Sequence, residues 1–500
     1  MKYKLRFTEI LVALILIAIL PSLPLTMSSQ AFSQVPGAGK EVATSKVERM
    51  NKAPVSKEML RVNLPKPVEA TLDNGISVLI MEDHRFPMVY VQLQLSSAGG
   101  LYDPAALPGL ANATASMLRE GTKTRTSKKL SEDIDRLGAT LNAYAGFGSP
   151  TASLSASGLS DNVDQWFPLL TDILFNSTFP PEELEKYKAR LKVQLKQQRS
   201  QPSFLAMEQF NRVVYGNHPA AIISTNEQAI NALTSEALAN WYRERYVPQG
   251  SILGIAGDVN PSELLPKLKQ WLGGWKQTNL KEVFPPSPVP VLSKTINLVD
   301  RPDSVQTTIL LGNIAIDRLS PDYIALTVMN RIVGGGPAAR LFINLREEKG
   351  YTYGVYSYFS ASRYAGPWMA SGDVRTEVTE GAMTEFLREI NRIRDEKVPE
   401  SELGECERSL VASFALSLEQ PIQLLGYAFT RKYYGLPNDY WETYPTKLMA
   451  TTADDVQRVA KKYVDPASLQ IVAVGEGNKI KTVLDKFGPV EVFDTEGKKK

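Results

Sequence analysis

The chemistry open to this chain is limited by how few of its side chains suit metal binding or nucleophilic catalysis. The 500 residues include only two histidines, His84 and His218, and one cysteine, Cys406. Each histidine stands alone in a predicted loop, and nothing in the spacing pairs them as metal ligands. A single cysteine excludes an intrachain disulfide framework and a Cys-rich zinc module. Cys406 lies in the acidic segment 402–407, which predicts a raised thiol pKa and disfavours a cysteine nucleophile.

The composition is that of a globular protein with balanced charge. Hydrophobic residues make up 43% of the chain and charged residues 22%, proportions that exclude collagen-like, coiled-coil and wholly disordered chains. The 56 basic and 54 acidic residues nearly cancel, and three of the basic residues lie in the first 33 positions. A neutral body argues against nucleic acid as the main partner. The length predicts roughly two to four domains.

The N-terminus has the three-part layout of an export signal. Lys2, Lys4 and Arg6 precede an apolar run over 10–20, which is short for a membrane span. We predict a signal peptide at 1–33, with an uncleaved signal-anchor as the alternative. Residues 34–64 are mixed polar and read as a flexible tether. The predicted location is periplasmic or otherwise extracytoplasmic, with membrane attachment only if the N-terminal segment is retained.

Two stretches of the chain repeat the same order of elements. A helix ending at Tyr246, a strand at 252–256, Gly257 and a helix at 261–272 match a second set near the C-terminus, with Tyr463 217 residues after Tyr246. The second set continues with a strand at 469–474, Gly475 and a helix at 479–487. This period predicts a duplicated domain.

The strands lie beside hairpin-type turns and paired helices without a regular βαβ rhythm. We therefore predict an α+β fold of two homologous domains, each a mostly antiparallel sheet packed by helices. The predicted boundaries are an N-terminal domain at 65–278, a proline-rich linker at 279–293, a C-terminal domain at 294–490 and a tail at 491–500.

A predicted helix at 110–119 carries the most informative pattern. Its sequence, Gly-Leu-Ala-Asn-Ala-Thr-Ala-Ser-Met-Leu from position 109, is followed by Glu-Gly-Thr at 120–122. This segment resembles the signature helix of the pitrilysin/insulinase superfamily of zinc metallopeptidases, which includes mitochondrial processing peptidase. Active members carry H-x-x-E-H there, two zinc-binding histidines and a glutamate that activates water. In this chain the three positions are Asn112, Ala115 and Ser116.

The resemblance also places a third zinc ligand, a glutamate, on a later helix that begins at Pro181. The matching position here is Gln194. Because an amide is a weak neutral ligand and the other matched positions offer no imidazole, carboxylate or thiolate, we expect no metal on this chain.

The second half matches the family's pattern more closely than the first half does. Residues 332–357 closely resemble the superfamily's most recognisable C-terminal segment, with a helix predicted from Pro337 to Lys349, a left-handed stop at Gly350 and a strand at 351–359. In the family, an arginine and a tyrosine seven apart hold the substrate backbone and donate a hydrogen bond to the oxyanion. The resemblance assigns these catalytic roles to Arg346 and Tyr353.

Further substrate contacts are predicted at two places. Gly334, Gly335 and Gly336 form either a plain turn before a helix or a flexible substrate-binding loop. The edge strand near Asn142, or its counterpart at 305–310, is expected to pair with a peptide as an added strand. Arg340 in the same segment is expected only to pack or to contact an interface.

A chain of this kind resembles one subunit of a two-chain peptidase. The resemblance implies a heterodimer in which a homologous H-x-x-E-H subunit holds the zinc, while this chain binds no cofactor and closes the chamber. The substrates would be short or unfolded peptides.

Three other classes remain open. The chain would be a structural subunit, like the core proteins of the respiratory bc1 complex, or a peptide-binding scaffold or chaperone-like module acting alone. The third, an independent hydrolase with a serine or cysteine nucleophile, is the weakest because no histidine lies near Cys406 in sequence.

Overall fold

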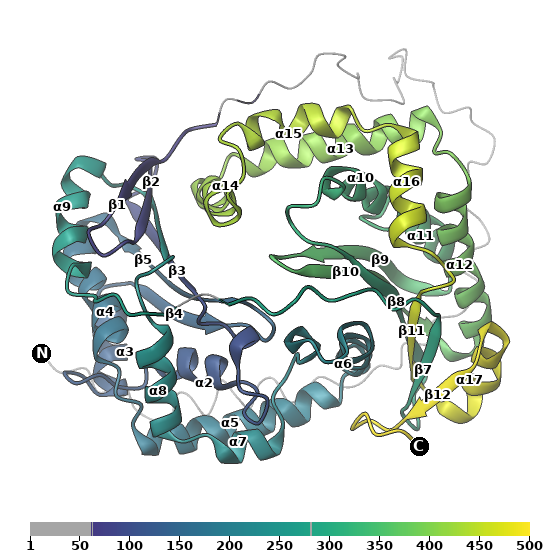
Figure 1. Cartoon of the computed structure of the whole chain (residues 1–500), viewed down its shortest axis with the longest axis horizontal. Coiled ribbons are helices and arrows are strands. Elements are labelled where there is room, and N and C mark those ends of the chain that lie inside the picture. The colour runs from purple at the N-terminus through teal and green to yellow at the C-terminus, as the bar shows by residue number, and fades with distance from the viewer. Residues whose placement is uncertain (1–61, 63, 281–282) are drawn as a thin grey trace, which may run out of the picture. The chain divides into compact units, whose positions relative to one another are not determined.

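The structure is a computed structural model, shown as a ribbon in Figure 1. It describes residue 62 and residues 64–280 and 283–500. The predicted export segment at 1–33 lies outside the described residues, as does the predicted tether at 34–64 apart from residues 62 and 64. The described residues fall in one compact unit, 59–500. Among them, no helix combines the length and the apolar character that crossing a membrane requires.

The first half forms a six-stranded sheet in the order β1-β2-β6-β3-β5-β4. All neighbours are antiparallel except β2 and β6. The strands are β1 (Val68–Thr71), β2 (Ser77–Glu82), β3 (Met88–Ser96), β4 (Thr140–Ala145), β5 (Thr151–Leu159) and β6 (Ile252–Gly257). The α-helices are α2 (Leu110–Met117), α3 (Ser127–Arg136), α4 (Val163–Asn176), α5 (Pro181–Arg199), α6 (Pro202–Tyr215), α7 (Glu227–Ala232), α8 (Ser235–Arg245) and α9 (Pro261–Leu272).

The second half forms another six-stranded sheet in the order β12-β7-β11-β8-β10-β9. The strands are β7 (Thr295–Asp300), β8 (Gln306–Ile316), β9 (Thr352–Ala361), β10 (Ala365–Arg375), β11 (Gln470–Gly475) and β12 (Val490–Phe493). The helices are α10 (Tyr323–Val333), α11 (Arg340–Phe342), α12 (Thr379–Asp395), α13 (Glu400–Ser417), α14 (Pro421–Tyr434), α15 (Tyr440–Met449), α16 (Ala453–Tyr463) and α17 (Gly477–Leu484). Five strands follow the topology of the first sheet, so the predicted α+β fold of two related domains is confirmed.

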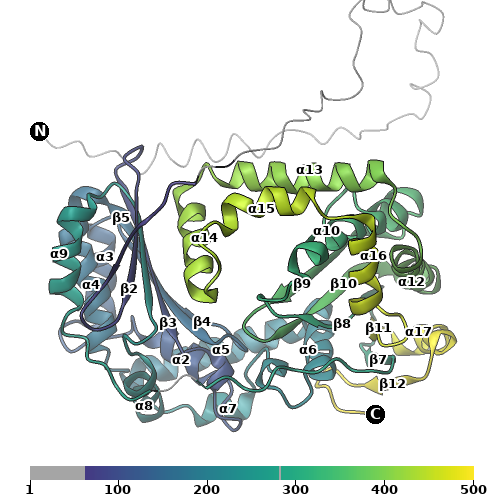
Figure 2. The same ribbon diagram turned by 45° about the horizontal axis from the view of Figure 1, so that its top comes forward.

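Each half lends a helix to the other half's sheet, as Figures 1 and 2 show. The blue-teal α6 packs on β7, β8 and β11, where Leu205 and Phe210 join a buried cluster with Leu310 and Val472. The yellow-green α14 packs on β2 and β6. There its buried Leu425 and Phe429 join Leu79, Met81, Ile252 and Ala256. The two halves therefore share hydrophobic clusters, in addition to the separate core that each half builds.

The turn before each of these two helices is bonded to an arginine from the other half of the chain. A Gln-Pro pair opens each helix, at 201–202 and again at 420–421. Arg301 donates to the Ser200 carbonyl at 3.3 Å, and Arg85 donates to the Glu419 carbonyl at 2.9 Å. The same arrangement, a Gln-Pro helix start held by an arginine of the other half, therefore occurs at both α6 and α14.

Two expected elements differ from the structure. The helix predicted from Pro337 to Lys349 begins only at Arg340, because Ala339 is extended (φ −83°, ψ 155°) and its N–H closes a turn onto the Gly336 carbonyl. Residues 343–348 then form a π-helical turn, which Gly350 ends at φ +62°. The edge strand predicted at 305–310 is also wrong, because β8 lies between β10 and β11 and the free edge belongs to β9.

Close approach of α14 to the first sheet predicts a steric test. A Cβ added to Gly254 would lie 2.1 Å from a ring carbon of Phe429, so we expect Gly254→Ala to lower the free energy of unfolding by about 1–3 kcal/mol. The Phe429→Ala substitution should lower the free energy of unfolding by less in the Gly254→Ala background than in the wild type. Gly426→Ala on α14 is the control, because nothing lies within 4 Å of its added Cβ, and it should be neutral or stabilising. Denaturant unfolding of the four variants measures these changes. If the effects of Gly254→Ala and Phe429→Ala on the free energy of unfolding were additive, the proposed contact between the two residues would be contradicted.

A buried carboxylate joins α10 to α16 and predicts a pH dependence. Burial alone would raise the pKa of Asp322, but hydrogen bonds from Tyr463, Lys462 and Arg458 outweigh it and lower the pKa to about 2. The ionised form therefore stabilises the fold above pH 4, and the benefit falls as the pH drops toward 2. We expect Asp322→Asn to cost about 2 kcal/mol at pH 7 and roughly half of that at pH 3.

Urea unfolding at the two pH values measures this difference. Asp454→Asn on α16, the helix that supplies the partners of Asp322, is the control, since its ion pair with Lys397 is exposed and should contribute less than about 1 kcal/mol. An equal cost of Asp322→Asn at both pH values would show that the carboxylate charge is not responsible.

Candidate functional site

The positions matched to the zinc motif lie on α2 and face α5. The Asn112 side chain donates to the Ala145 carbonyl at 3.1 Å and accepts from the Tyr187 hydroxyl at 3.1 Å. Tyr187 is 8% exposed, and burial raises its pKa, so the phenol is neutral. Ala115 is buried and Ser116 half-buried on the same helix. Neutral hydrogen bonds thus join the two helices where the family carries charge.

Both ends of α2 are held by polar side chains, of which Ser177 is buried and Asp103 half-buried. At the start, the Asp103 carboxylate accepts from the backbone N–H groups of Gly109 (2.6 Å) and Ala111 (2.9 Å). Burial raises the pKa of Asp103 to about 6, against the opposing effect of these N–H donors. At the other end, the Ser177 hydroxyl donates to the Leu118 carbonyl at 2.8 Å.

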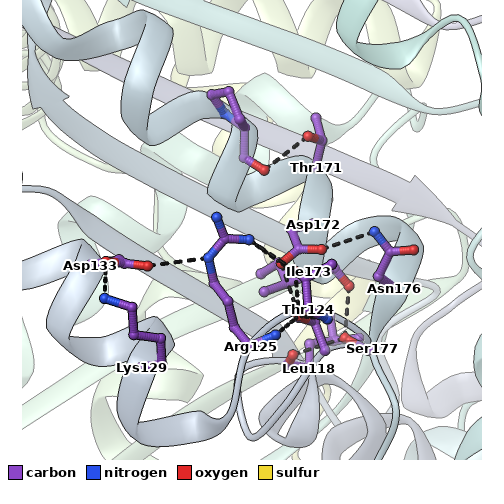
Figure 3. A network of polar contacts seen from close by, with 12 residues as sticks. Leu118, Thr124, Arg125, Lys129, Asp133, Thr171, Asp172, Ile173, Asn176 and Ser177 are labelled. Atoms are coloured by element: carbon purple, nitrogen blue, oxygen red, sulfur yellow. Dashed lines mark hydrogen bonds and ion pairs between the residues drawn. The ribbon is translucent and has the colours of Figure 1, made fainter.

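Ser177 adjoins a wider polar network on α4 and the loop after α2, drawn in Figure 3. The Asp172 carboxylate accepts from Arg125 (2.7 Å), Thr124 (2.9 Å) and Asn176 (2.9 Å). Burial raises the pKa of Asp172, but these hydrogen bonds outweigh it and the pKa is lowered. The helix is therefore rigidly placed although its metal-binding groups are replaced.

The donor set near α2 does not fit zinc. Gln194, the position matched to the third zinc ligand, is exposed on α5 two turns beyond Tyr187. Amide, phenol and alcohol groups are poor zinc ligands in comparison with imidazole, thiolate and carboxylate. Within residues 64–280 and 283–500, no three His, Cys, Asp or Glu side chains are grouped so as to hold a metal ion.

The two histidines lie in separate environments. His84, in the turn after β2, is hydrogen-bonded to Asp258 (2.6 Å) and Glu82 (2.8 Å), which raise its pKa. His218 precedes a short 3₁₀ turn, where its Nδ1 accepts from the Ala220 N–H and burial lowers its pKa. Neither is part of the α2 site.

Arg346 and Tyr353 are brought together by the π-helical turn and the start of β9. The Arg346 guanidinium carbon lies 4.7 Å from the centre of the Tyr353 ring and 4.8 Å from that of Phe342. Tyr353 is 87% exposed, and in the described part of the chain its hydroxyl makes no hydrogen bond. The arginine is thus oriented by aromatic stacking and by an ion pair between its Nε and Glu347 at 3.4 Å, while the phenol is free to donate.

The turn beneath this pair is fixed by a residue that the motif did not single out. Asn344 is buried and donates to both Glu385 (2.8 Å) and Glu389 (2.7 Å) on α12. Arg340, predicted to pack, is buried and forms a two-pronged ion pair with Glu402 at 2.7 Å. An uncharged amide inside a charged helical segment was the one signal in the sequence that could have pointed to Asn344.

The other predicted substrate contacts are placed differently. Gly334 and Gly336 are buried, and Arg331 folds over the turn and donates to the Gly335 carbonyl at 2.6 Å. This packing suits a structural turn and gives no support to a substrate-binding loop. Asn142 is exposed on β4, which is the free edge of the first sheet, as expected.

Cys406 is buried on α13, and its thiol pKa is raised to about 12. The main cause is burial, with the neighbouring glutamates adding to it, whereas the sequence argument named only the acidic neighbours. A thiol with this pKa is not a nucleophile at neutral pH.

Comparison with known proteins matches two consecutive segments of the chain to one family. Residues 77–226 match the model of "Insulinase (Peptidase family M16)", and residues 232–410 match that of "Peptidase M16 inactive domain". A crystal structure of a peptidase M16 inactive domain from Pseudomonas fluorescens superimposes with a TM-score of 0.76 and 26% identity, covering 83% of this chain and 98% of that one.

Curated relatives carry contrasting names. A Bacillus subtilis protein named "Uncharacterized zinc protease YmxG" is 23% identical over 70% of this chain and 84% of its own length. A Helicobacter pylori protein named "Non-peptidase homolog YmxG" is 23% identical over 81% of this chain and 93% of its own length. The similarity therefore extends to proteins named as peptidases and to one named as a non-peptidase.

The neutral donor set of α2 predicts the response to metal. We expect the purified chain to contain well under one zinc per molecule and to keep its melting temperature after treatment with a chelator, because no fitting ligands exist at Asn112, Ala115 and Ser116. Elemental analysis and thermal unfolding measure the two quantities. A quadruple variant with histidine at 112 and 116 and glutamate at 115 and 194 serves as the positive control. Stoichiometric zinc in the wild type would contradict the prediction.

Proposed function

We propose a function from the premise that this chain belongs to the insulinase family (peptidase family M16), with residues 232–410 matching the family's inactive domain. The chain acts as the non-zinc-binding subunit of a heteromeric metallopeptidase. A homologous partner with H-x-x-E-H holds the zinc and hydrolyses the peptide. This chain closes the chamber and supplies Arg346 and Tyr353.

The observation that supports this proposal is the contrast between the two halves. Asn112 and Tyr187 fill the α2 site with neutral hydrogen bonds, yet Arg346 and Tyr353 remain stacked and accessible on a rigid turn. The exposed hydroxyl of Tyr353 makes no hydrogen bond in the described residues and so does not stabilise the fold. It is placed where it can donate to a group of another molecule.

Each side chain has a separate task in the proposed reaction. The Arg346 guanidinium, held between two aromatic rings, donates to a carbonyl of the bound peptide and fixes its position. The Tyr353 hydroxyl donates to the oxygen that gains negative charge when the peptide carbonyl is attacked. Proton transfer to and from water is left to the partner subunit.

The substrates are short or unfolded peptides that add a strand to a sheet edge, for which Asn142 on β4 marks the available edge. The signal-like N-terminal segment supports an extracytoplasmic location for the complex.

Substitution of the two residues tests the proposal in the co-purified complex. We expect Arg346→Ala and Tyr353→Phe each to lower kcat by about 100-fold, because one transition-state contact is lost, without dissociating the subunits. Arg243→Ala, which removes an exposed arginine on α8 that bonds to its own helix at the Ala239 carbonyl, is the control and should leave turnover unchanged.

Peptide hydrolysis, zinc content and subunit ratio are measured on the same preparations. Unchanged turnover in both variants would sink the assigned roles. A chain that isolates alone, without zinc or activity, would instead make it an inert scaffold of the same fold.

A further inference from the structure

A cavity of about 500 Å³ lies between the two sheets beside α14, and we call it the neutral pocket. Its lining comes from β3, the β4–β5 turn, the β9–β10 turn and α14. None of its 14 lining residues is Asp, Glu, Lys, Arg or His, although 22% of the chain is charged. The pocket can therefore offer hydrogen bonds and aromatic faces to a ligand, but no counter-charge.

The hydrogen-bonding side of the pocket is strand β3. Gln92 and Gln94 lie two residues apart and so project from the same face of the strand. Both are half-buried, and within the described residues neither side-chain amide makes a hydrogen bond. Two amides at this spacing can pair with the N–H and C=O groups of an extended chain.

The aromatic side of the pocket is α14. Phe429 packs over Gly254, and Gly254 is the register partner of Gln92 on the neighbouring strand β6. The phenyl ring therefore lies next to the amides. Tyr433 and Tyr434 extend the aromatic surface, with their ring centres 4.8 Å apart in an edge-to-face arrangement.

The remaining wall joins the two halves. The Tyr364 hydroxyl, from the β9–β10 turn, donates to the Gly148 carbonyl in the β4–β5 turn at 2.7 Å. Arg363 next to it is not a lining residue, because its guanidinium stacks on Tyr433 at 4.4 Å and donates to the Tyr433 carbonyl. This cation is therefore already engaged by the protein.

The chain's own proline-rich linker contacts the same turn. The Ser287 hydroxyl accepts from the Ala365 N–H at 3.0 Å, and Arg363 lies 5.4 Å from the centre of the Phe284 ring. The described residues of the linker form neither helix nor strand. The linker thus lies beside the turn that supplies Ser362 and Tyr364 to the neutral pocket, although it does not line the pocket itself.

We propose that the neutral pocket binds an extended, uncharged peptide segment that contains proline. A charged side chain entering it would lose water without gaining a partner of opposite charge. Proline rings stack on aromatic faces, and an extended backbone leaves its polar groups free for the two glutamines. The inference rests on the proposed function only in taking a peptide as the ligand.

Binding of three capped decapeptides to the purified full chain, without a partner subunit, tests the proposal by fluorescence anisotropy. One contains only proline, serine and glutamine, and the others carry a central Glu or a central Lys. We expect the uncharged peptide to bind at least about 10-fold more tightly than either charged one. Gln92→Lys should reverse the order in favour of the Glu peptide, and Gln94→Lys is the second variant if the first fails to fold.

Gln165→Lys on α4 is the matched control, since this exposed glutamine lies outside the pocket and the order should not change. Equal affinity for all three peptides, or no reversal in a folded Lys variant, would overturn the proposal. Binding of a neutral oligosaccharide without binding of any peptide would also overturn it. Because no turnover is measured, failure of the roles of Arg346 and Tyr353 would leave this result intact.

Discussion

The exchange of α6 and α14 between the two sheets is the constraint on which the rest of the structure depends. It places Phe429 of the second half directly over Gly254 of the first, a site where any other residue would collide with the ring. Two buried apolar clusters then cross from one half to the other. A relative movement of the halves would expose both clusters, so the distance between β3 and the β9–β10 turn is held by hydrophobic burial.

The helix α2, which carries the positions matched to the zinc motif, is also firmly held. Removing ligands from a catalytic helix usually leaves uncompensated buried groups, but here Asn112 and Tyr187 satisfy each other and α2 stays anchored through Asp103 and Ser177. These hydrogen bonds hold α2 through neutral side chains and backbone groups, apart from the Asp103 carboxylate. The exposed side chain of Tyr353, by contrast, takes no part in holding α2 in place.

Local signals in the sequence located most elements but not their partners. The helix at 261–272 and the long helix at Pro181 were predicted within a residue, because proline at the first turn and an acidic start mark helix N-termini. The same proline signal failed at Pro337, where the turn closed by Gly336 takes precedence. The unbroken apolar run at 309–311 belongs to an interior strand covered on both faces, a pattern that the prediction of an edge overlooked.

Nothing in the pattern of α14 says which sheet it covers, since an apolar helix face indicates only that it is buried. The neutral pocket escaped prediction for the same reason: its residues come from four segments that only the exchange brings together. By contrast, Arg346 and Tyr353 lie seven residues apart in one turn and strand, so a local motif was enough to pair them.

The position of α6 on the second sheet also means that its packing cannot be completed until synthesis reaches the C-terminal strand β11. Its apolar face, with Leu205, Phe210 and Val214, packs against β11, which begins only at Gln470. A ribosome adds roughly 5–20 residues per second, so this face waits on the order of 10–50 s for its sheet. During that interval the nascent first half presents an apolar helix face without the sheet that covers it, and such a surface is prone to aggregation.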